Sequence, residues 1–382
     1  MHLTAAIANA AHSAALNTLR EAVSGAGRDE VADKAENLIP GLIDGASEGA
    51  DAAIAFDKQL ATQPPVFQLT AFPQPIDSRA YVNPRTNSNP RGDYASLFAF
   101  RALVDPIPAF THYYSASGSS TETAWEELVT GAAVQGDSSF ARNSLARAQQ
   151  VYEQSKVSNL DGSLGSWHPA YATPENWYDF SIAGRFVDFE IDLSNPDSPM
   201  SGFVAIPGGG VPPALNWLIA PPGCKPVPVG LDPRTRLKAL RAKALVVTIT
   251  RQWLNLDLFR INGLYLPGQP SGLYSSGTLQ DNDGLMPLIP SAFCLAVGVE
   301  IAGDWSPADT KILAQATRNQ ARVALGQFAL SSGGAANERT GPGVVPPAQY
   351  AATFEGGTVS TSAVQLIGWI STLVPLCPRI AG

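Results

Sequence analysis

The sequence predicts an α+β protein in which a helical N-terminal part is followed by a β-rich domain of the sandwich or Greek-key type. The first 60 residues are rich in alanine, whereas later segments alternate apolar and polar residues as strands do. The 382 residues include 34 Gly and 31 Pro, which favour turns, and only 15% are Asp, Glu, Lys or Arg. An average soluble protein has about 25% charged residues, so this composition excludes a coiled coil or a long helical bundle.

Residues 1–62 are predicted to form an acidic helical module. Leu16, Leu19 and Val23 recur at helical spacing, and the segment 28–57 holds eight acidic residues against two basic ones. Residues 63–92 are rich in Pro and Asn. Because proline lacks a backbone donor and disfavours a helix before it, this second stretch is predicted to be an ordered arm or a linker.

Residues 93–180 are predicted to be a mixed, mainly helical segment. The residues at 119–122 have the spacing of a capping box, in which a hydroxyl and a carboxylate bond the free amides of a helix start. A second helix is expected over 138–156, with Phe140 and Tyr152 on its apolar side.

Residues 181–382 are predicted to form the β-rich domain, with one inserted helix near 307–320. The segment 187–193 alternates apolar and acidic residues without interruption, which is the period of a half-buried strand. Apolar runs rich in β-branched residues predict further strands at 246–250, at 293–299 and, as two late strands, within 356–378.

The inserted helix has a local start signal. Ser306 is a preferred cap, Pro307 suits the first helical position, and Asp309 places an acid in the first turn. The segment 207–233 contains eight prolines and five glycines and is therefore expected to hold no regular element.

Several function classes lack their sequence signals. The formal net charge of −8 offers no general attraction for nucleic acid, which is not an expected partner. Neither a nucleophile elbow nor a glycine-rich phosphate loop occurs, so the chain is interpreted as non-enzymatic, with no cofactor apart from a weak indication of calcium. The widely spaced Cys224, Cys294 and Cys377 are expected to be buried free thiols. The four histidines are interpreted as structural or surface residues, and they are His2, His12, His112 and His168.

The location of the protein is predicted from two absent signals. No basic residue precedes the first apolar stretch, so a signal peptide is not expected. The uncharged run 356–378 contains too many hydroxyl and amide side chains for a membrane helix. We therefore expect synthesis in the cytoplasm, with release as part of an assembly as a further option.

The acidic strand is the first candidate site. Asp188, Glu190 and Asp192 project from one strand face about 6.5–7 Å apart, a separation found between paired carboxylates in sugar hydrolysis. Together with Asp281 and Asp283 they could also bind Ca²⁺. The alternative interpretation is a solvated strand face and an ordinary turn.

The second candidate site is a basic stretch that follows the helix-start signal at 232–233. It could bind an anionic membrane, another polyanion, or the acidic module of a neighbouring copy, or it could be a surface helix that leads into the strand at 246. Its residues are Arg234, Arg236, Lys238, Arg241 and Lys243.

The third candidate site is aromatic. Trp167, Tyr171, Trp177 and Tyr178 lie close together in the sequence and, if exposed, could stack on glycan rings or anchor a protein partner. If buried, they would pin a loop to the core.

These features favour a self-assembling structural protein that forms homo-oligomers through complementary acidic and basic surfaces. A low surface charge with acid and base gathered in different regions suits head-to-tail contacts between copies. Two alternatives stay open. One is a secreted, toxin-like protein that binds membranes or glycans, and the other is a carbohydrate-active enzyme that uses the acidic strand.

Overall fold

The computed structural model describes residues 65–84, 89, 91–92, 94–111, 113–114, 116–157, 167–182, 184–193, 215–222, 224–333 and 350–382. The acidic helical module predicted over 1–62 lies outside the described residues. Strands predominate over helices in the described part, which confirms that the protein is β-rich.

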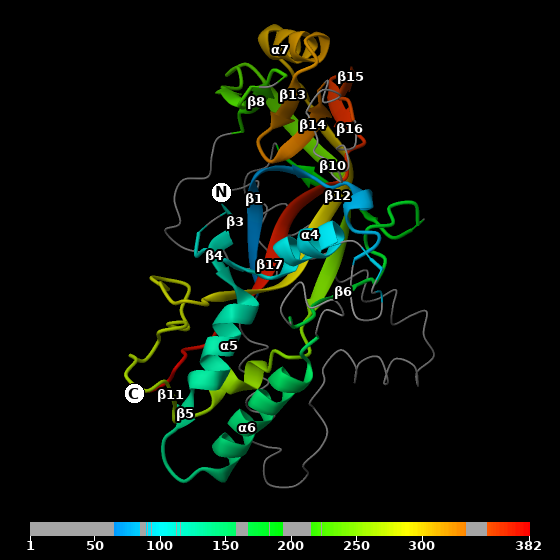
Figure 1. Ribbon diagram of the computed structural model, residues 1–382. Coiled ribbons are helices and arrows are strands. Elements are labelled where there is room, and N and C mark those ends of the chain that lie inside the picture. Colours follow the sequence, from blue (N-terminus) through cyan, green and yellow to red (C-terminus); the bar gives the residue numbers. More distant parts are fainter. Residues whose placement is uncertain are drawn as a thin grey trace.

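A nine-stranded sheet forms the body of the molecule (Figure 1). Its strands are β1 (Val66–Pro75), β3 (Tyr113–Tyr114), β6 (Tyr171–Thr173), β7 (Val187–Asp192), β10 (Arg236–Thr250), β12 (Leu288–Asp304), β15 (Thr353–Glu355), β16 (Thr358–Thr361) and β17 (Gln365–Leu373). β12 pairs antiparallel with β10 on one side and with β16 and β17 on the other. β1 extends the sheet beyond β17, and β3 joins β1 in parallel.

Smaller elements cover the two ends of this sheet. A four-stranded sheet consists of β8 (Trp217–Ala220), β9 (Val227–Val229), β13 (Arg322–Leu325) and β14 (Phe328–Ser332). Two short pairs are β2 (Pro106–Pro108) with β4 (Ala116–Ser120), and β5 (Ala133–Val134) with β11 (Leu264–Tyr265). The helices are α4 (Tyr94–Val104), α5 (Thr121–Gly131), α6 (Ser139–Gln154) and α7 (Pro307–Arg318), with 3₁₀ turns η1 (Ser78–Ala80) and η2 (Leu256–Arg260).

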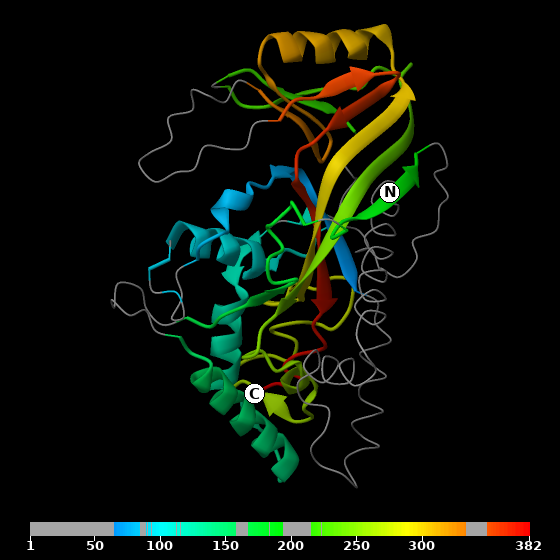
Figure 2. The same ribbon diagram turned by 90° about the vertical axis from the view of Figure 1, so that its right-hand side faces the viewer.

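The length of two central strands makes the molecule elongated. β10 has 15 residues and β12 has 17, so at about 3.3 Å per residue β12 alone spans roughly 56 Å. These strands run from the four-stranded sheet and α7 at one end toward α5 and α6 at the other (Figures 1 and 2). The two ends of the molecule are therefore far apart.

The central strands are buried on both faces. Val246 and Cys294 belong to a core shared with α7 and the four-stranded sheet, whereas the adjacent Val247 and Phe293 belong to a core shared with α4. Successive side chains of a strand point to opposite faces, so each apolar run supplies both cores. Burial of one such large side chain stabilises the fold by about 1.5–3 kcal/mol.

A single buried carboxylate joins the elements at the α7 end. Asp309 is fully buried and accepts hydrogen bonds from Trp217 Nε1–H (2.9 Å), Asp232 N–H (3.1 Å) and the Thr235 hydroxyl. Its own backbone N–H donates to the cap Ser306 Oγ (3.1 Å). This carboxylate thus links β8, the start of β10 and the first turn of α7.

A second core lies between α5, α6 and η2 at the opposite end. Trp125 and Leu128 of α5 are fully buried, and Trp125 meets Phe259 edge to face at 5.5 Å between ring centroids. Tyr152 of α6 contributes to the same cluster. α5 and α6 therefore pack at the end of the main sheet opposite α7 and on the loops beside it.

The predicted fold class is wrong. The described chain opens with β1, which lies inside the main sheet beside β17, and the four helices alternate with strands instead of forming an N-terminal helical part. β1 comes from the stretch 63–92. Its Pro73 lies where the ladder with β17 is interrupted between Leu69 and Gln74, so a missing N–H costs little there.

The interpretation of the basic stretch as a surface helix before 246 is also wrong, because residues 236–250 form one continuous strand, β10. Leu237 and Leu240 both pack toward the same core, which imitates the spacing of a helix. The cause is a register shift between Leu237 and Ala239 in the pairing with β12. A bulge inserts an extra residue, so the side chains beyond it point to the faces opposite to those that strict alternation predicts.

The segment 207–233 contains strands where no regular element was expected. Pro221 and Pro222 follow β8, and Pro228 lies in β9 at the edge of the four-stranded sheet. An edge strand tolerates proline because its outward N–H has no ladder partner to lose. A high proline content therefore does not exclude strands, in particular at the edge of a sheet.

Several local predictions are confirmed. The segment 187–193 contains β7, the two late strands are β16 and β17, and α7 begins after its cap Ser306. The helix expected over 138–156 is α6, although its Phe140 is 76% exposed. α5 is capped one residue later than expected, by Ser120, whose Oγ accepts from Thr123 N–H at 3.0 Å.

Within the described residues, no helix combines the length and the apolar character that a membrane-spanning helix needs.

Candidate functional site

The acidic strand and the basic stretch, predicted as separate sites, lie side by side. The register pairs are Asp188 with Lys243, Glu190 with Arg241, and Asp192 with Ala239. Arg241 Nη2 lies 2.8 Å from Glu190 Oε1, and Lys243 Nζ lies 3.7 Å from Asp188 Oδ1. The side chains are 54–84% exposed, so these ion pairs form on an open strand face.

The remaining basic residues meet acids near the start of β10. Lys238 Nζ lies 2.6 Å from Asp304 Oδ1, and Arg234 makes a two-point contact with Asp232. These hydrogen bonds from Arg234 lower the pKa of Asp232 below its usual range. Four of the five predicted patch residues thus have acidic partners within the chain, and Arg236 lies opposite Asp304 in the register.

The segment 281–284 is organised by an amide rather than by carboxylates. Asn282 is buried, and its Nδ2 donates to Ser275 Oγ (3.0 Å) and to the Thr278 carbonyl (3.1 Å). Asp281 and Asp283 are exposed. Among the residues that the structure describes, no three His, Cys, Asp or Glu side chains gather as metal ligands, which holds for Asp188, Glu190, Asp281 and Asp283. The side chain of Asp192 lies outside the described part.

The aromatic cluster is mostly buried. Trp177 is 2% exposed and contacts Tyr81 and Phe293, with ring centroids 4.8 and 5.0 Å away. Trp167 is buried too, and Tyr178 packs beside Trp177. Tyr171 is 49% exposed, which leaves it the most accessible of the four for a glycan or a partner.

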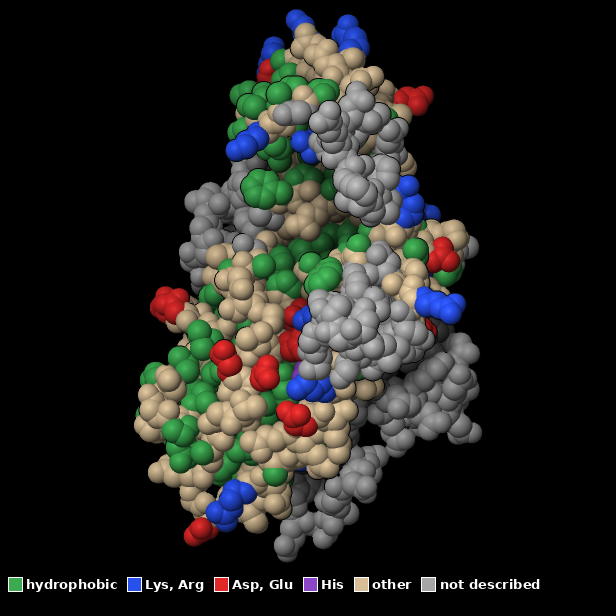
Figure 3. Space-filling model, in the orientation of Figure 1, with side chains coloured by type: hydrophobic (Ala, Val, Ile, Leu, Met, Phe, Trp, Pro, Cys, Tyr) green, Lys and Arg blue, Asp and Glu red, His purple; other side chains and the backbone are tan. Residues whose placement is uncertain are grey.

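The two ends of the molecule differ in charge. At the α7 end, residues 215–238, 304–333 and 353–361 carry seven Lys or Arg against four Asp or Glu, one of which is the buried Asp309. At the other end, residues 116–157, 253–286 and 374–382 carry eight Asp or Glu against five Lys or Arg. In the space-filling view, blue side chains predominate at the top, whereas most of the red ones lie in the lower half, where blue ones also occur (Figure 3). We call these regions the basic end and the acidic end.

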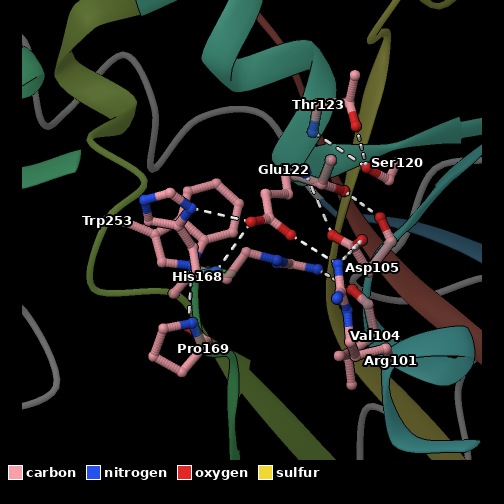
Figure 4. A network of polar contacts seen from close by, with 11 residues as sticks. Arg101, Val104, Asp105, Ser120, Glu122, Thr123, His168, Pro169 and Trp253 are labelled. Carbon is pink, nitrogen blue, oxygen red and sulfur yellow. Dashed lines mark hydrogen bonds and ion pairs between the residues drawn. The ribbon is translucent and has the colours of Figure 1, made fainter. Parts of the chain in front are cut away.

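A buried polar network lies where the helices of the acidic end meet the sheet (Figure 4). Glu122 Oε1 accepts hydrogen bonds from the His168 backbone N–H (2.8 Å) and lies 2.9 Å from His168 Nδ1. Glu122 Oε2 accepts from Arg101 Nη2 at 2.7 Å. Asp105 Oδ1 accepts from the Glu122 backbone N–H at 3.2 Å. The carboxylate of Glu122 is thus enclosed by donors from α4 and from the segment before β6.

Arg251 extends this region toward the main sheet. Its side chain is buried and donates to the Pro290 carbonyl (2.7 Å) and to the Val104 carbonyl. Burial lowers the pKa of Arg251 to about 10, while the nearby Asp105 opposes that change. Burial likewise raises the pKa of Asp105. Arg251 therefore remains a cation at neutral pH and fastens β10 to β12 and α4.

Sequence patterns did not predict this network. From them His168 was expected to be a structural or surface histidine among aromatics, and Glu122 part of a capping box. The two residues are 46 positions apart, and no spacing rule connects them. Because both hydrogen-bonding ends of each side chain are occupied by protein groups, the arrangement fastens elements together and presents no free base to a ligand.

Comparisons with known proteins give no identification. No family model matches the chain, and neither the curated proteins nor the solved structures include a match. Function is therefore inferred from the chemistry of the chain itself.

Proposed function

We propose that the chain is a non-enzymatic structural protein that assembles head to tail with copies of itself, the basic end of one copy contacting the acidic end of the next. The observation that carries this proposal is the separation of charge along an elongated body. Seven basic residues gather at the α7 end, and eight acidic residues gather at the end formed by α5, α6 and the loops beside them.

The position of the charges distinguishes the ends from the middle. In the middle, β7 and β10 balance each other through ion pairs across the strands. At the basic end, the exposed Lys225 and Lys311 make no ion pair with a residue in the described ranges. Their charge is available to a second copy, and attraction between unlike ends accelerates association and fixes orientation.

Exposed apolar side chains occur at both ends and supply surface that association can bury. Val227 of the edge strand β9 is 56% exposed at the basic end, and Phe140 of α6 is 76% exposed at the acidic end. Contact between different surfaces of identical subunits is heterologous, and it gives a ring if the rotation closes or a filament if it does not. The predicted homo-oligomer would thus be one of these two forms.

Charge reversal at each end tests this proposal. The variant K225E/K311E should lose assembly because two acidic ends then face each other. The variant E126K/E127K, with both changes on the exposed side of α5, should lose it because two basic ends meet. Mixing the two variants should restore large species, since every contact then joins opposite charges.

Mass photometry at low ionic strength, where surface charges are weakly screened, measures the outcome. A matched control is R142Q, which removes an exposed base within the acidic end and should leave assembly intact. Assembly that survives both reversals, or a mixture that stays monomeric while each variant folds, would contradict the proposal. Glycan or membrane binding through Tyr171 or the basic end stays a prediction for separate tests.

A further inference from the structure

Three leucines lie together on the loops of the acidic end. Leu285 and Leu376 are 48% and 40% exposed, and Leu273 is half-buried. The Leu285 N–H donates to the Leu273 carbonyl at 2.9 Å, and Leu376 Cδ1 would touch a side-chain carbon added at Gly272, the residue before Leu273. Hydrophobic side chains gather at this edge of the molecule in Figure 3, over the loops drawn in yellow in Figure 1. We call Leu273, Leu285 and Leu376 the leucine surface.

The leucine surface faces solvent because the next residue of each segment faces the core. Tyr274, Met286 and Cys377 are at most 2% exposed and belong to the core around α5 and α6. Adjacent side chains of an extended segment point to opposite sides, so the three leucines point outward. Exposed apolar side chains that gather within a polar rim mark sites of contact with another molecule.

Acidic side chains form that rim. Asp281 and Asp283 are exposed and flank Asn282, whose hydrogen bonds hold the turn. Glu127 of α5 is exposed as well. Burial raises the pKa of Tyr274, and the charge of Glu127 adds to the rise, which places Glu127 near the leucine surface. A partner that suits this surface therefore combines apolar groups with positive charge.

An exposed segment of the basic end has this combination. Residues 224–228 are all exposed and read Cys-Lys-Pro-Val-Pro, so one lysine stands among apolar side chains. Val227 at its centre is 56% exposed. Arg322 adds a second positive charge nearby, because its Nη2 donates to the Cys224 carbonyl at 3.4 Å. We call residues 224–228 the proline segment.

The proline segment can make contact through its side chains but cannot recruit another strand. It contains the start of β9, the outer strand of the four-stranded sheet, and Pro228 lies within the register with β8. Proline has no N–H, so Val227 and Val229 supply the donors toward β8, and Pro228 offers none on the free side. Pro226, at the alternate position, offers none either. An edge without donors does not extend a sheet, which leaves the apolar side chains and Lys225 for contact.

Another exposed apolar side chain of the acidic end suits the proline segment less well. Phe140 of α6 is 76% exposed. The charges beside it are Asp137 and Arg142, which lie 3.8 Å apart and balance each other. No excess of acid is left there to attract Lys225, whereas Asp281 and Asp283 at the leucine surface have the same sign.

We propose that the proline segment of one copy lies on the leucine surface of the next copy, with Lys225 facing Asp281 and Asp283. This inference rests on the proposed head-to-tail assembly and names the two surfaces that meet in it. Affinity comes from the apolar contact, because it removes Val227 and the exposed leucines from water. Direction comes from the charges, because two proline segments would repel each other through their lysines.

Photo-crosslinking from the native chain tests this contact without any variant. Cys224, expected from the sequence to be buried, is exposed, whereas Cys294 and Cys377 are buried. Burial also raises the pKa of both buried thiols, so a maleimide carrying a benzophenone attaches to Cys224. On irradiation of a mixture of ¹⁴N and ¹⁵N chains, the label should bond to residues 273–286 or 374–378 of another copy. Bonds between copies that fall only on α6, or elsewhere, would overturn the proposal.

Serine substitutions separate this contact from assembly in general. L285S/L376S should raise the concentration at which half of the chains are assembled about tenfold, because two exposed leucines no longer leave water on contact. The matched control F140S removes an exposed apolar side chain from the same end and should leave that concentration unchanged. Sedimentation velocity measures both.

The outcomes distinguish the contact from the assembly. If the native chain assembles and L285S/L376S assembles equally well, the docking site is wrong and the proposed function stands. The same holds if F140S alone weakens assembly. A native chain that stays monomeric would overturn both the docking site and the proposed function.

Discussion

The two ends of the molecule each contain a buried carboxylate that joins several elements, but the carboxylates have different partners. Asp309 at the basic end receives its hydrogen bonds from an indole, a backbone amide and a hydroxyl, none of which is charged. Glu122 at the acidic end is bonded by the guanidinium of Arg101 and the imidazole of His168. One connection thus depends on neutral donors, whereas the other includes a guanidinium cation.

The neutral donors around Asp309 do not titrate near neutral pH, so the connection at the basic end should keep the same strength over several pH units. The connection at Glu122 instead holds a guanidinium and an imidazole against one carboxylate. Both buried carboxylates differ in turn from the exposed ion pairs of the middle region, which water and salt screen.

The largest effect is expected for D309N. An asparagine keeps one acceptor oxygen but places an NH₂ group against donors, so at least one buried donor loses its partner. The free energy of unfolding should fall by about 3 kcal/mol, by the same amount at pH 6 and pH 9. Urea titration measures this. The control D304N, which removes an exposed acid from the same end, should cost under about 1 kcal/mol. Equal losses in the two variants would contradict the role of Asp309.

The next effect is expected for W217F, which removes the indole N–H bonded to Asp309. A hydrogen bond to a charged group is worth about 1.5–3 kcal/mol, and one between neutral groups about 1 kcal/mol. W217F should therefore destabilise the protein by about 2 kcal/mol. W305F, whose indole donates to the Gly357 carbonyl, should cost about 1 kcal/mol. Thermal unfolding of both variants gives the ranking, and the reverse order would argue against a charged Asp309.

A smaller effect is expected for E190Q in the middle region. The Glu190–Arg241 pair is about half exposed on both sides, and such pairs contribute roughly 0.2–1 kcal/mol. The loss on substitution should be about 0.5 kcal/mol in dilute buffer and should disappear in 1 M salt. A double-mutant cycle with R241Q isolates the coupling. A coupling above 2 kcal/mol would mean that the strand pair resembles the buried connections.

The smallest effect at neutral pH is expected at Asp232, whose pKa is held below its usual range by hydrogen bonds from Arg234. A depressed folded-state pKa adds stability above the unfolded value of about 3.9, and that stability is lost as pH falls through the lower folded value. D232N should thus be slightly less stable than the native chain at pH 7, and the gap should narrow toward pH 2. Urea unfolding at both pH values measures the gap, and a constant gap would contradict this linkage.

Local signals in the sequence predicted local structure well. The cap Ser306, the proline after it and the acid at 309 act within one helical turn, and α7 begins there. The alternation of apolar and acidic residues in 187–193 predicted β7, because that pattern also depends only on neighbouring residues. The start of β10 was missed because a bulge near Leu237 is decided by the pairing with β12, a strand that begins some 40 residues after β10 ends.

The polar contacts between distant residues could not be predicted from the sequence, because no local pattern contains them. Glu122 meets His168 across 46 positions, and Trp217 meets Asp309 across 92. The acidic and basic stretches could be recognised as charged, but their pairing follows from the register of β7 on β10. The separation of charge between the two ends likewise depends on which segments the long strands carry to each end.

Sedimentation velocity of the full chain at micromolar concentration, in dilute buffer and in 1 M salt, tests the central claim most directly. Head-to-tail assembly through charged ends predicts species of several chains in dilute buffer that dissociate to monomers in salt, because the Debye length falls from about 10 Å at 0.1 M to about 3 Å at 1 M. A single monomeric species under both conditions would contradict the proposed assembly.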